Sequence, residues 1–356
     1  MDFIYMQFID LQLFAEGGEV ITGTTNYPNA YDSSQSQGFD ATNKMSPTMK
    51  TYYDTELLEN ARNEFYFEQF GKKVGLPANH GRMLEWRKWN TLPNTKTLTE
   101  GVIPTGEKLG MSSLTAELAQ YGLYVAVTDL LDLHAIDNVI LGATEELGAS
   151  AGQTQDILVR NVLDQATNVI YADTVTNGVA TTPGNYAAMS KANNRLTPDM
   201  VNKAATWLKK CHAPTINGKY IAIIHPSVTY DLRSSSEWLE VHKYSQTTEI
   251  FNGEIGELHG VRFIESHNAR VHQETLNDGA AMCYTCYFLG KDAYGVVDVS
   301  GGNLEMITKT RDQIGGPLNQ FSTIGYKFEA CARILYPERI VRVEVCSAYS
   351  EKDTAN

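Results

Sequence analysis

The stretch from Arg82 to Tyr171 constrains the fold most, because two strand-like segments are followed by one long helical pattern. The two segments, Arg82–Trp89 and Met111–Leu118 (continuing towards Thr128), flank a polar segment rich in glycine and proline, which predicts a long hairpin. A two-stranded hairpin alone is only marginally stable in water. No second sheet is evident nearby in the same chain, so we expect a neighbouring copy to supply a surface. The pattern therefore favours an assembly protein over an enzyme.

The helical pattern runs from Ile136 to Tyr171. Its apolar residues recur at helical spacing, at positions 136, 140, 143, 147, 151, 158, 162, 166 and 169. At about 1.5 Å per residue, an unbroken helix here would be roughly 50 Å long. Gly148 and Gly152 each cost about 1 kcal/mol relative to alanine and would permit a bend. We expect this helix to be a spine on which other elements pack.

The C-terminal part of the chain alternates between apolar and polar residues. Apolar side chains occupy every second position from Ile324 to Ile334, and a second such segment spans Ile340–Cys346. This pattern predicts two half-buried antiparallel strands. Their apolar faces match the need of the spine helix for a packing partner.

The segment between the helix and these strands has the pattern of a mixed α/β lobe. Thr197-Pro198-Asp199 caps a predicted helix over Met200–Lys210, whose last turn is basic. A buried strand is expected at Tyr220–Ile224 and a short helix at Pro226–Arg233. Further strands are expected at 261–265, 281–289, 295–299 and 304–308. We therefore predict a discontinuous first lobe with an α/β lobe inserted into it.

The N-terminal region has a different composition. Residues 15–46 are rich in Gly, Ser, Thr, Asn and Gln, which predicts a flexible arm or one that is ordered by a partner. Ser46-Pro47 is typical of a helix start, and Gly71–Gly81 is expected to be an exit loop. The apolar residues near Met1 are not expected to form a signal peptide, because acidic residues interrupt them and no basic residue precedes Lys44.

Overall charge and cysteine content narrow the function further. The chain has 356 residues, a net charge of -13 and a pI near 5.1, which disfavours binding to DNA through phosphate neutralisation. No apolar run approaches the roughly 20 residues that span a bilayer, so we expect no membrane partner. Five scattered cysteines do not resemble a disulfide framework and fit a reducing cytosol.

Two short motifs could carry chemistry. Gly148-Ala-Ser-Ala-Gly152 matches the G-x-S-x-G pattern of hydrolases, in which the serine must sit between a strand and a helix. Here Ser150 lies in mid-helix, so small residues for close helix packing are the better interpretation. Cys283 and Cys286 match C-x-x-C, but they lie in a strand pattern, where residues three apart face opposite sides. A hydrolase or a thiol or metal enzyme is thus the weaker hypothesis, and no cofactor is expected.

The aromatic residues of the hairpin favour a binding surface. Trp86 and Trp89 lie on its first strand, where a single subunit could hardly bury both, and aromatic residues are common interface hot spots. The alternative is that both pack on the spine helix of their own chain. The contact with a neighbouring subunit is expected to use Trp86, Trp89, Leu98, Glu100, Val102 and Lys108.

The chain resembles a known family, the major capsid proteins of tailed phages, and within it the group of N-four-type phage capsid proteins. The resemblance is carried, in order, by Met45-Ser-Pro, Tyr52–Ala61, Gln69–Lys73, Leu84–Trp89, Leu98–Gly106, Gln120–Leu133 and Gly253–Arg262. Each motif is weak alone, and together they cover most of residues 45 to 346.

The resemblance implies an α+β fold of the Hong Kong 97 type, with a long spine helix, an extended hairpin loop and an inserted axial α/β domain. In these terms the regions are a flexible N-terminal arm (1–46), an N-terminal helix and exit loop (47–77), the extended hairpin loop (78–128), the peripheral domain (129–172 and 321–350) and the axial domain (173–320).

The function implied is that of a major capsid protein, which self-assembles into an icosahedral shell enclosing double-stranded phage DNA without sequence-specific binding. The implied partners are other copies, as pentamers and hexamers, with a portal and with scaffold or cement proteins. The implied location is the virion, assembled in the cytoplasm of a bacterial host. The alternative with the same fold is the shell of a bacterial nanocompartment that holds a protein cargo.

Overall fold

The computed structural model describes a large part of the chain in two compact units. The described residues are 66–76, 81–89, 92, 97, 100–101, 103, 106–134, 139–176, 179–235, 237–238, 254–299, 304–314, 318–349 and 353–356. The small unit includes Gln120–Ala151 and Asn303–Phe328, and the large unit comprises Asn63–Ala119, Gly152–Gly302 and Glu329–Asn356. The predicted N-terminal arm and the helix expected from Ser46 lie outside the described residues.

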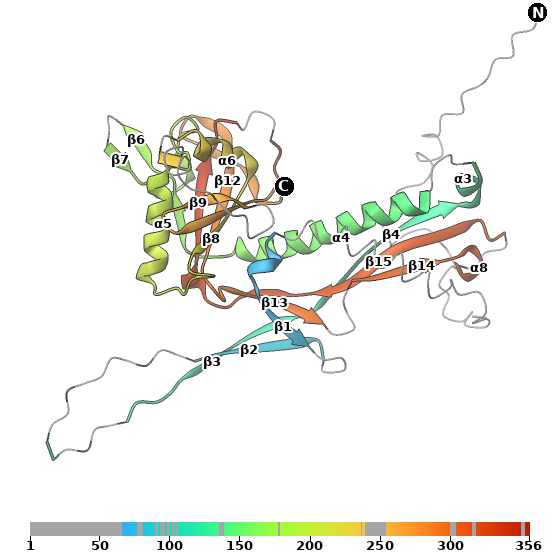
Figure 1. Cartoon of the computed structure of the whole chain (residues 1–356), viewed down its shortest axis with the longest axis horizontal. Coiled ribbons are helices and arrows are strands. Elements are labelled where there is room, and N and C mark those ends of the chain that lie inside the picture. Colours follow the sequence, from blue (N-terminus) through green and yellow to red (C-terminus); the bar gives the residue numbers. More distant parts are fainter. Residues whose placement is uncertain are drawn as a thin grey trace, which may run out of the picture. The chain divides into compact units, whose positions relative to one another are not determined.

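The large unit is organised around a seven-stranded mixed sheet (Figure 1). Its strand order is β5 (Val169–Tyr171), β17 (Ile340–Cys346), β12 (Gly279–Leu289), β8 (Tyr220–Ile224), β10 (Val261–Glu265) and β9 (Glu254–Leu258), with β11 (Val271–Leu276) also paired to β12. β8 and β10 are parallel, as are β17 and β5, whereas β12 is antiparallel to β8 and β17.

Helices cover both faces of this sheet. On one face, α5 (Pro198–Lys210) and α6 (Pro226–Arg233) pack on side chains that include Ala222 and Ile224 of β8. On the other face, Ile221 and Ile223 pack with Leu163, near the end of helix α4 (Val139–Leu163), and with residues around the short helix η2 (Glu68–Phe70). Because alternate residues of a strand face opposite sides, β8 is buried on both faces and holds the core together.

Local sequence signals determine several of these elements. The Oγ1 atom of Thr197 accepts a hydrogen bond from the backbone N of Met200 (3.4 Å), and Pro198 is the first residue of α5, as the capping pattern predicted. The predicted strand Tyr220–Ile224 and helix Pro226–Arg233 are confirmed as β8 and α6. The other predicted strands correspond to β10, β12, β13 (Tyr294–Val299) and β14 (Glu305–Lys309), with ends shifted by at most two residues.

The small unit is built on a three-stranded sheet with the order β14, β15 (Phe321–Ala330) and β4 (Ala119–Thr128). It also contains α3 (Asp129–His134), α8 (Arg311–Ile314) and the first half of α4. Its buried side chains include Val127, Leu147 and Ile324, and the rings of Tyr121 and Phe328 stack with their centroids 5.6 Å apart.

The remaining elements of the large unit carry the hairpin. Strands β1 (Lys72–Leu76), β13 and β16 (Ala332–Ile334) form a three-stranded sheet, and β2 (Met83–Trp89) pairs with β3 (Met111–Glu117). A small hairpin of β6 (Thr174–Thr176) and β7 (Val179–Thr181) and the short helices η3 (Tyr186–Ala188) and η4 (Pro337–Arg339) complete the unit.

Three sequence predictions differ from this architecture. The long helix ends at Leu163 rather than Tyr171, because the chain turns there and Val169–Tyr171 pairs with β17 as β5. The expected exit loop after Gly71 contains β1, which pairs in parallel with β13. Ile340–Cys346 is fully enclosed between β5 and β12, and is therefore not a half-buried strand. The predicted domain boundaries stay predictions.

Candidate assembly surface

The β2–β3 hairpin has two faces of different character. The strands pair in antiparallel register from Met83 opposite Glu117 to Trp89 opposite Met111, which confirms the hairpin predicted from the sequence. Two hydrogen bonds between Arg82 and Leu118 close its base. The backbone N of Leu118 donates to the carbonyl O of Arg82 (2.9 Å), and a guanidinium N of Arg82 donates to the carbonyl O of Leu118 (3.2 Å). β4 follows directly but pairs with β15 instead of extending the hairpin towards Thr128.

The inner face is anchored on the large unit by Trp86. Its side chain is 8% exposed and packs with Leu118, Val297 and Leu335. The indole also lies against the backbone of Gly295, where an added β-carbon would lie 3.1 Å from the ring. A glycine at this position of β13 is therefore needed for the ring to lie flat on the strand.

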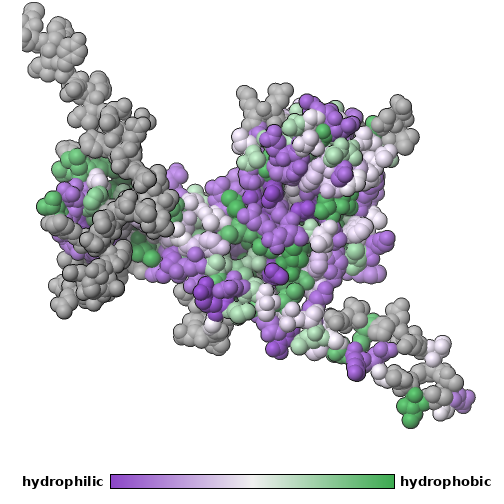
Figure 2. All heavy atoms as spheres, turned by 180° about the vertical axis from the view of Figure 1, so that it is seen from behind, coloured by the Kyte–Doolittle hydropathy of each residue, from purple (hydrophilic) through white to green (hydrophobic). Residues whose placement is uncertain are grey.

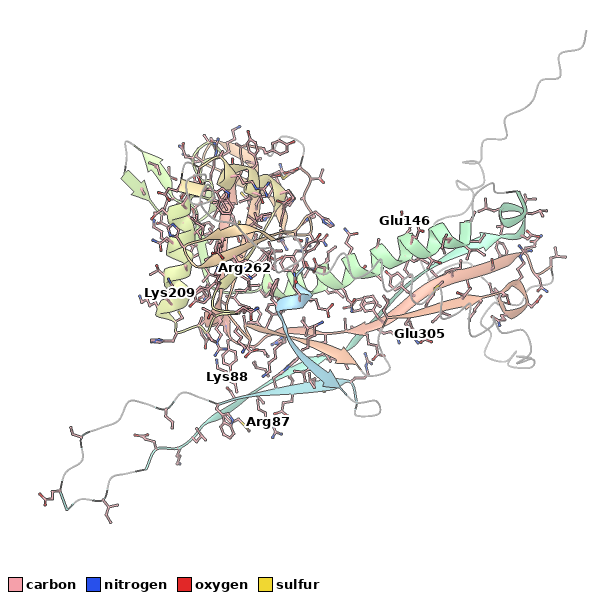
Figure 3. All side chains as sticks on the ribbon, in the orientation of Figure 1. Arg87, Lys88, Glu146, Lys209, Arg262 and Glu305 are labelled. Carbon is pink, nitrogen blue, oxygen red and sulfur yellow. The ribbon has the colours of Figure 1, made fainter. Side chains whose placement is uncertain are left out.

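A polar cluster extends this anchor at Lys88. Its Nζ atom donates to a carboxylate oxygen of Glu338 (2.9 Å) and lies 4.3 Å from the centre of the Tyr336 ring. The guanidinium carbon of Arg339 also lies over this ring, 3.8 Å from its centre. Burial alone would raise the pKa of Glu338, but hydrogen bonds from its own backbone and from Lys88 hold that pKa below its usual value. Figure 3 shows Arg87 and Lys88 on opposite sides of the hairpin, as strand alternation requires.

The outer face and the far end of the hairpin expose large apolar side chains. Trp89 is 61% exposed and Ile103 is 93% exposed. The same class includes Met83, Leu92, Leu109 and Met111. Figure 2 shows hydrophobic atoms along this hairpin among polar ones. Apolar side chains gathered on one projecting segment are typical of a surface that another molecule covers.

The predicted contact residues fall into three groups. Trp89, Glu100 and Lys108 are exposed, whereas Leu98 and Val102 lie outside the described residues. Trp86 is turned inward onto β13 of its own chain, which contradicts the expectation that it faces a neighbour, and it does not pack on the spine helix either. Three positions separate it from Trp89, and this odd spacing on a strand could have shown that the two rings face opposite sides.

The sequence interpretation missed other exposed apolar residues. On the hairpin these are Met83, Leu92, Ile103, Leu109 and Met111. In the small unit, Leu130 and Leu133 of α3 and Leu318 are 54%, 77% and 73% exposed. The backbone N of Asp129 donates to the carbonyl O of Gln320 (2.9 Å), so α3 and the segment around Leu318 lie at the same end of that unit. No periodic pattern marks these leucines, because they lie in short segments.

The candidate chemical motifs lie in structural positions. Ser150 is within α4, where its Oγ atom lies 3.3 Å from the phenolic oxygen of Tyr326. Cys283 and Cys286 are buried in β12 and belong to different clusters on opposite faces of the sheet. Among the described residues, no group of three or more His, Cys, Asp or Glu side chains could hold a metal ion. No helix in the described part of the chain is long and apolar enough to cross a bilayer.

Buried polar groups stabilise the large unit from within. The carboxylate of Asp156 accepts hydrogen bonds from the backbone N atoms of Tyr66 (2.9 Å) and Phe67 (2.6 Å) and from the amide of Asn268 (3.1 Å). Burial raises the pKa of this carboxyl to about 6, although those hydrogen bonds oppose the shift. Asp156 thus connects α4 to the segment that leads into β1.

The comparisons with solved structures identify the class of fold. The chain is similar to the capsid of Ralstonia phage GP4 (TM-score 0.60, 13% identity, covering 83% of this chain and 93% of that one). It is also similar to a chain of the head structure of Helicobacter pylori bacteriophage KHP40 (TM-score 0.57, 12% identity, covering 77% of this chain and 87% of that one). A third similar structure is the capsid of cyanophage P-SCSP1u (TM-score 0.56, 14% identity, 80% and 88% covered). At these identities the likeness shows the fold, which is that of a phage capsid subunit.

The sequence itself gives the family. A sequence model described as phage capsid protein matches residues 112–331, more than half of the chain. The chain therefore belongs to the phage capsid protein family, and the expectation of a tailed-phage capsid protein with a Hong Kong 97 type fold is confirmed. A comparison with curated proteins gave no match.

Proposed function

We propose that the chain forms the icosahedral shell of a tailed phage by self-assembly, and that its β2–β3 hairpin lies on a neighbouring copy. One observation carries the hairpin contact: its inner face is anchored on its own subunit at Trp86, while Trp89, Ile103 and Met111 are exposed. The anchor fixes the direction of the hairpin, and the exposed apolar side chains supply the driving force for contact.

The remaining details of the assembly belong to the same proposal. The copies form pentamers and hexamers, a portal occupies part of the shell, and scaffold or cement proteins assist. A net charge of -13 suits a container into which a motor drives DNA, because the wall attracts the nucleic acid only weakly. Assembly takes place in the bacterial host cytoplasm. The family match favours this role over a nanocompartment shell.

A shortened hairpin tests the contact directly. Trp89 and Met111 are the last paired residues of β2 and β3, so residues 90–110 can be replaced by an Asn-Gly turn, which closes two-residue hairpins well. The shortened subunit should fold with an unchanged circular dichroism spectrum and should fail to form shells in electron micrographs. Normal shells from this variant would contradict the contact.

A point substitution offers a milder test with a matched control. Trp89→Ser removes an indole that is 61% exposed from the hairpin, whereas Trp207→Ser removes one that is 40% exposed from α5. We expect at least a tenfold higher concentration for shell formation with Trp89→Ser, since interface tryptophans commonly contribute about 2 kcal/mol or more. The Trp207→Ser subunit should stay close to the parent. Equal behaviour of the two variants would contradict a specific role of the hairpin.

A further inference from the structure

Two of the buried cysteines face each other across neighbouring strands. Cys283 of β12 and Cys346 of β17 are register partners in the antiparallel ladder. They are 0% and 1% exposed and belong to one cluster with Met189 and Leu276. Both are free thiols. Cys286, three residues along β12, belongs to the cluster on the other face.

The backbone hydrogen bonds show which kind of pair these cysteines form. Along β17, the backbone N of Arg342 donates to the Asn168 carbonyl (2.9 Å), and the backbone N of Cys346 donates to the Asn194 carbonyl (2.7 Å). The backbone groups of these even-numbered residues are therefore directed away from β12. Cys346 and its partner Cys283 consequently form a non-hydrogen-bonded pair.

The geometry of such a pair suits a covalent bond. In a non-hydrogen-bonded pair the Cα atoms are about 4.5 Å apart and the two side chains lie close together on the same face. A disulfide requires Cα atoms about 4.4 to 6.8 Å apart. The strands therefore hold the two sulfur atoms where a bond can form without movement of the backbone.

We propose that Cys283 and Cys346 are an oxidation site that forms an intrachain disulfide when the protein leaves a reducing environment. Cytosolic reductants keep thiols reduced, and released particles lose that protection. The release of particles rests on the proposed shell function, whereas the formation of the bond rests only on the β12–β17 geometry. The oxidant is a small peroxide, which suits a site buried from larger reagents.

The chemical steps assign a different role to each sulfur. The thiolate of Cys346 attacks a peroxide oxygen and the O–O bond breaks, which gives a sulfenic acid and a hydroxide; the hydroxide takes up the proton that the Cys346 thiol lost and forms one water. The Cys283 sulfur then attacks the Cys346 sulfur, its proton leaves with the displaced hydroxide as a second water, and the S–S bond forms. Two thiols are oxidised and one hydrogen peroxide is reduced.

The surroundings of the pair favour this order of attack. The hydrogen bond from the Cys283 thiol lowers the pKa of Cys346, although burial and the charges of Asp278 and Asp231 oppose that shift. The same hydrogen bond, together with burial, raises the pKa of Cys283. Because the thiolate is the reactive form, Cys346 is the first nucleophile.

Peptide mapping of the full-length protein tests the site. Purified subunits and assembled particles are treated separately with hydrogen peroxide, free thiols are blocked under denaturing conditions, and the digest is analysed by mass spectrometry without reduction. We expect a peptide that joins Cys283 to Cys346 and has lost two hydrogen atoms. Unlinked, fully blocked cysteines at both positions would overturn the proposal, as would a link from Cys283 to Cys286 or between subunits.

Variants and a stability measurement separate the disulfide from general oxidation. The bond closes a loop of about 60 residues and should raise the melting temperature by roughly 5–10 °C. Cys283→Ala and Cys346→Ala should each abolish this rise, and the matched control Cys286→Ala should keep it. If an alanine variant does not fold, the peptide map of the parent protein still shows whether the bond between Cys283 and Cys346 forms. Subunits that contain the intrachain disulfide but form no shells would count against the proposed function and would still support the disulfide site.

Discussion

The seven-stranded sheet of the large unit and the β2–β3 hairpin bury the side chains of their strands very differently. Every residue of β8 is buried, and helices cover both faces of the sheet around it. Strand β2 of the hairpin fully buries only Trp86, and its outward positions include the exposed apolar residues Met83 and Trp89. The sheet is therefore stabilised within one chain, whereas the hairpin keeps apolar surface available for a second molecule.

A core substitution in the sheet should give the largest effect on folding. Phe288 is fully buried and packs edge-to-face on Phe263, with ring centroids 6.4 Å apart. Phe288→Ala should lower the free energy of unfolding by about 3–5 kcal/mol, because it leaves a cavity in a packed core. Trp89→Ala should change the same quantity by less than about 0.5 kcal/mol. Urea unfolding of both variants measures the difference. Similar losses of stability would contradict the conclusion that the sheet, and not the outer face of the hairpin, stabilises the single chain.

Substitution of the buried Glu344 should have the next largest effect on the free energy of unfolding, and this effect should depend on pH. Its carboxylate accepts a hydrogen bond from Thr285 (2.9 Å), and burial raises its pKa to about 7, although Arg342 opposes the shift. Between the unfolded pKa near 4.5 and the folded pKa, the folded state binds a proton that the unfolded state does not. Protonated Glu344 therefore favours folding fully below about pH 4.5, and this contribution declines as the pH rises from there and is gone above about 7.

Glu344→Gln should consequently raise the free energy of unfolding at pH 8, by up to about 3 kcal/mol, and change it little near pH 5. Unfolding curves at both pH values measure this difference. His272 contributes with the opposite sign, because burial lowers its pKa to about 4, but it is present in both proteins. Glu145→Gln, at an exposed position of α4, is the control. A loss of stability of Glu344→Gln at pH 8 would show that the folded protein favours the charged form of Glu344.

The anchor of the hairpin is sensitive to a smaller change. A β-carbon at position 295 would lie 3.1 Å from the Trp86 indole, so Gly295→Ala should displace the ring from its present contact with β13. We expect a loss of about 1–3 kcal/mol, typical of overpacking, together with a red-shifted tryptophan fluorescence spectrum. Gly106→Ala, which meets no neighbouring atom, is the matched control. An unchanged spectrum for Gly295→Ala would show that the anchor is looser than this contact indicates.

The ion pair at the edge of the anchor should give the smallest effect. Lys88→Gln removes the contact with Glu338 and with the Tyr336 ring, in a partly exposed setting. Such pairs contribute about 0.2–1 kcal/mol, and salt screens them. The difference from the parent, measured by urea unfolding, should shrink further in 1 M salt. A salt-independent loss would indicate that the aliphatic part of Lys88 contributes more than its charge.

The sequence predicted those elements whose signals are local. The cap at Thr197 and the basic last turn at Lys209 and Lys210 identified α5 to within two residues. The hairpin strands could be predicted because a polar, glycine-rich segment separates two alternating runs. These patterns need no information from distant parts of the chain.

The elements that escaped prediction depend on distant partners. β1 contains Gly75 in a glycine-rich context and becomes a strand only through pairing with β13, more than 200 residues later. The direction of Trp86 depends on the space above Gly295, which the sequence around the tryptophan does not reveal. At the candidate surface, the sequence therefore indicated the hairpin but not which of its two tryptophans is exposed.

The central place of β17 has a consequence for the order in which the protein can mature on the ribosome. This strand lies between β5 and β12, although it is translated after both of them. Until Ile340–Cys346 emerges, β5 and β12 have no partner on their facing edges, and open edges recruit other strands. A nascent chain therefore cannot complete its main sheet until Ile340–Cys346 has been translated. Ribosome stalling before Ile340 should leave an aggregation-prone product and thereby keep unfinished subunits out of productive assembly.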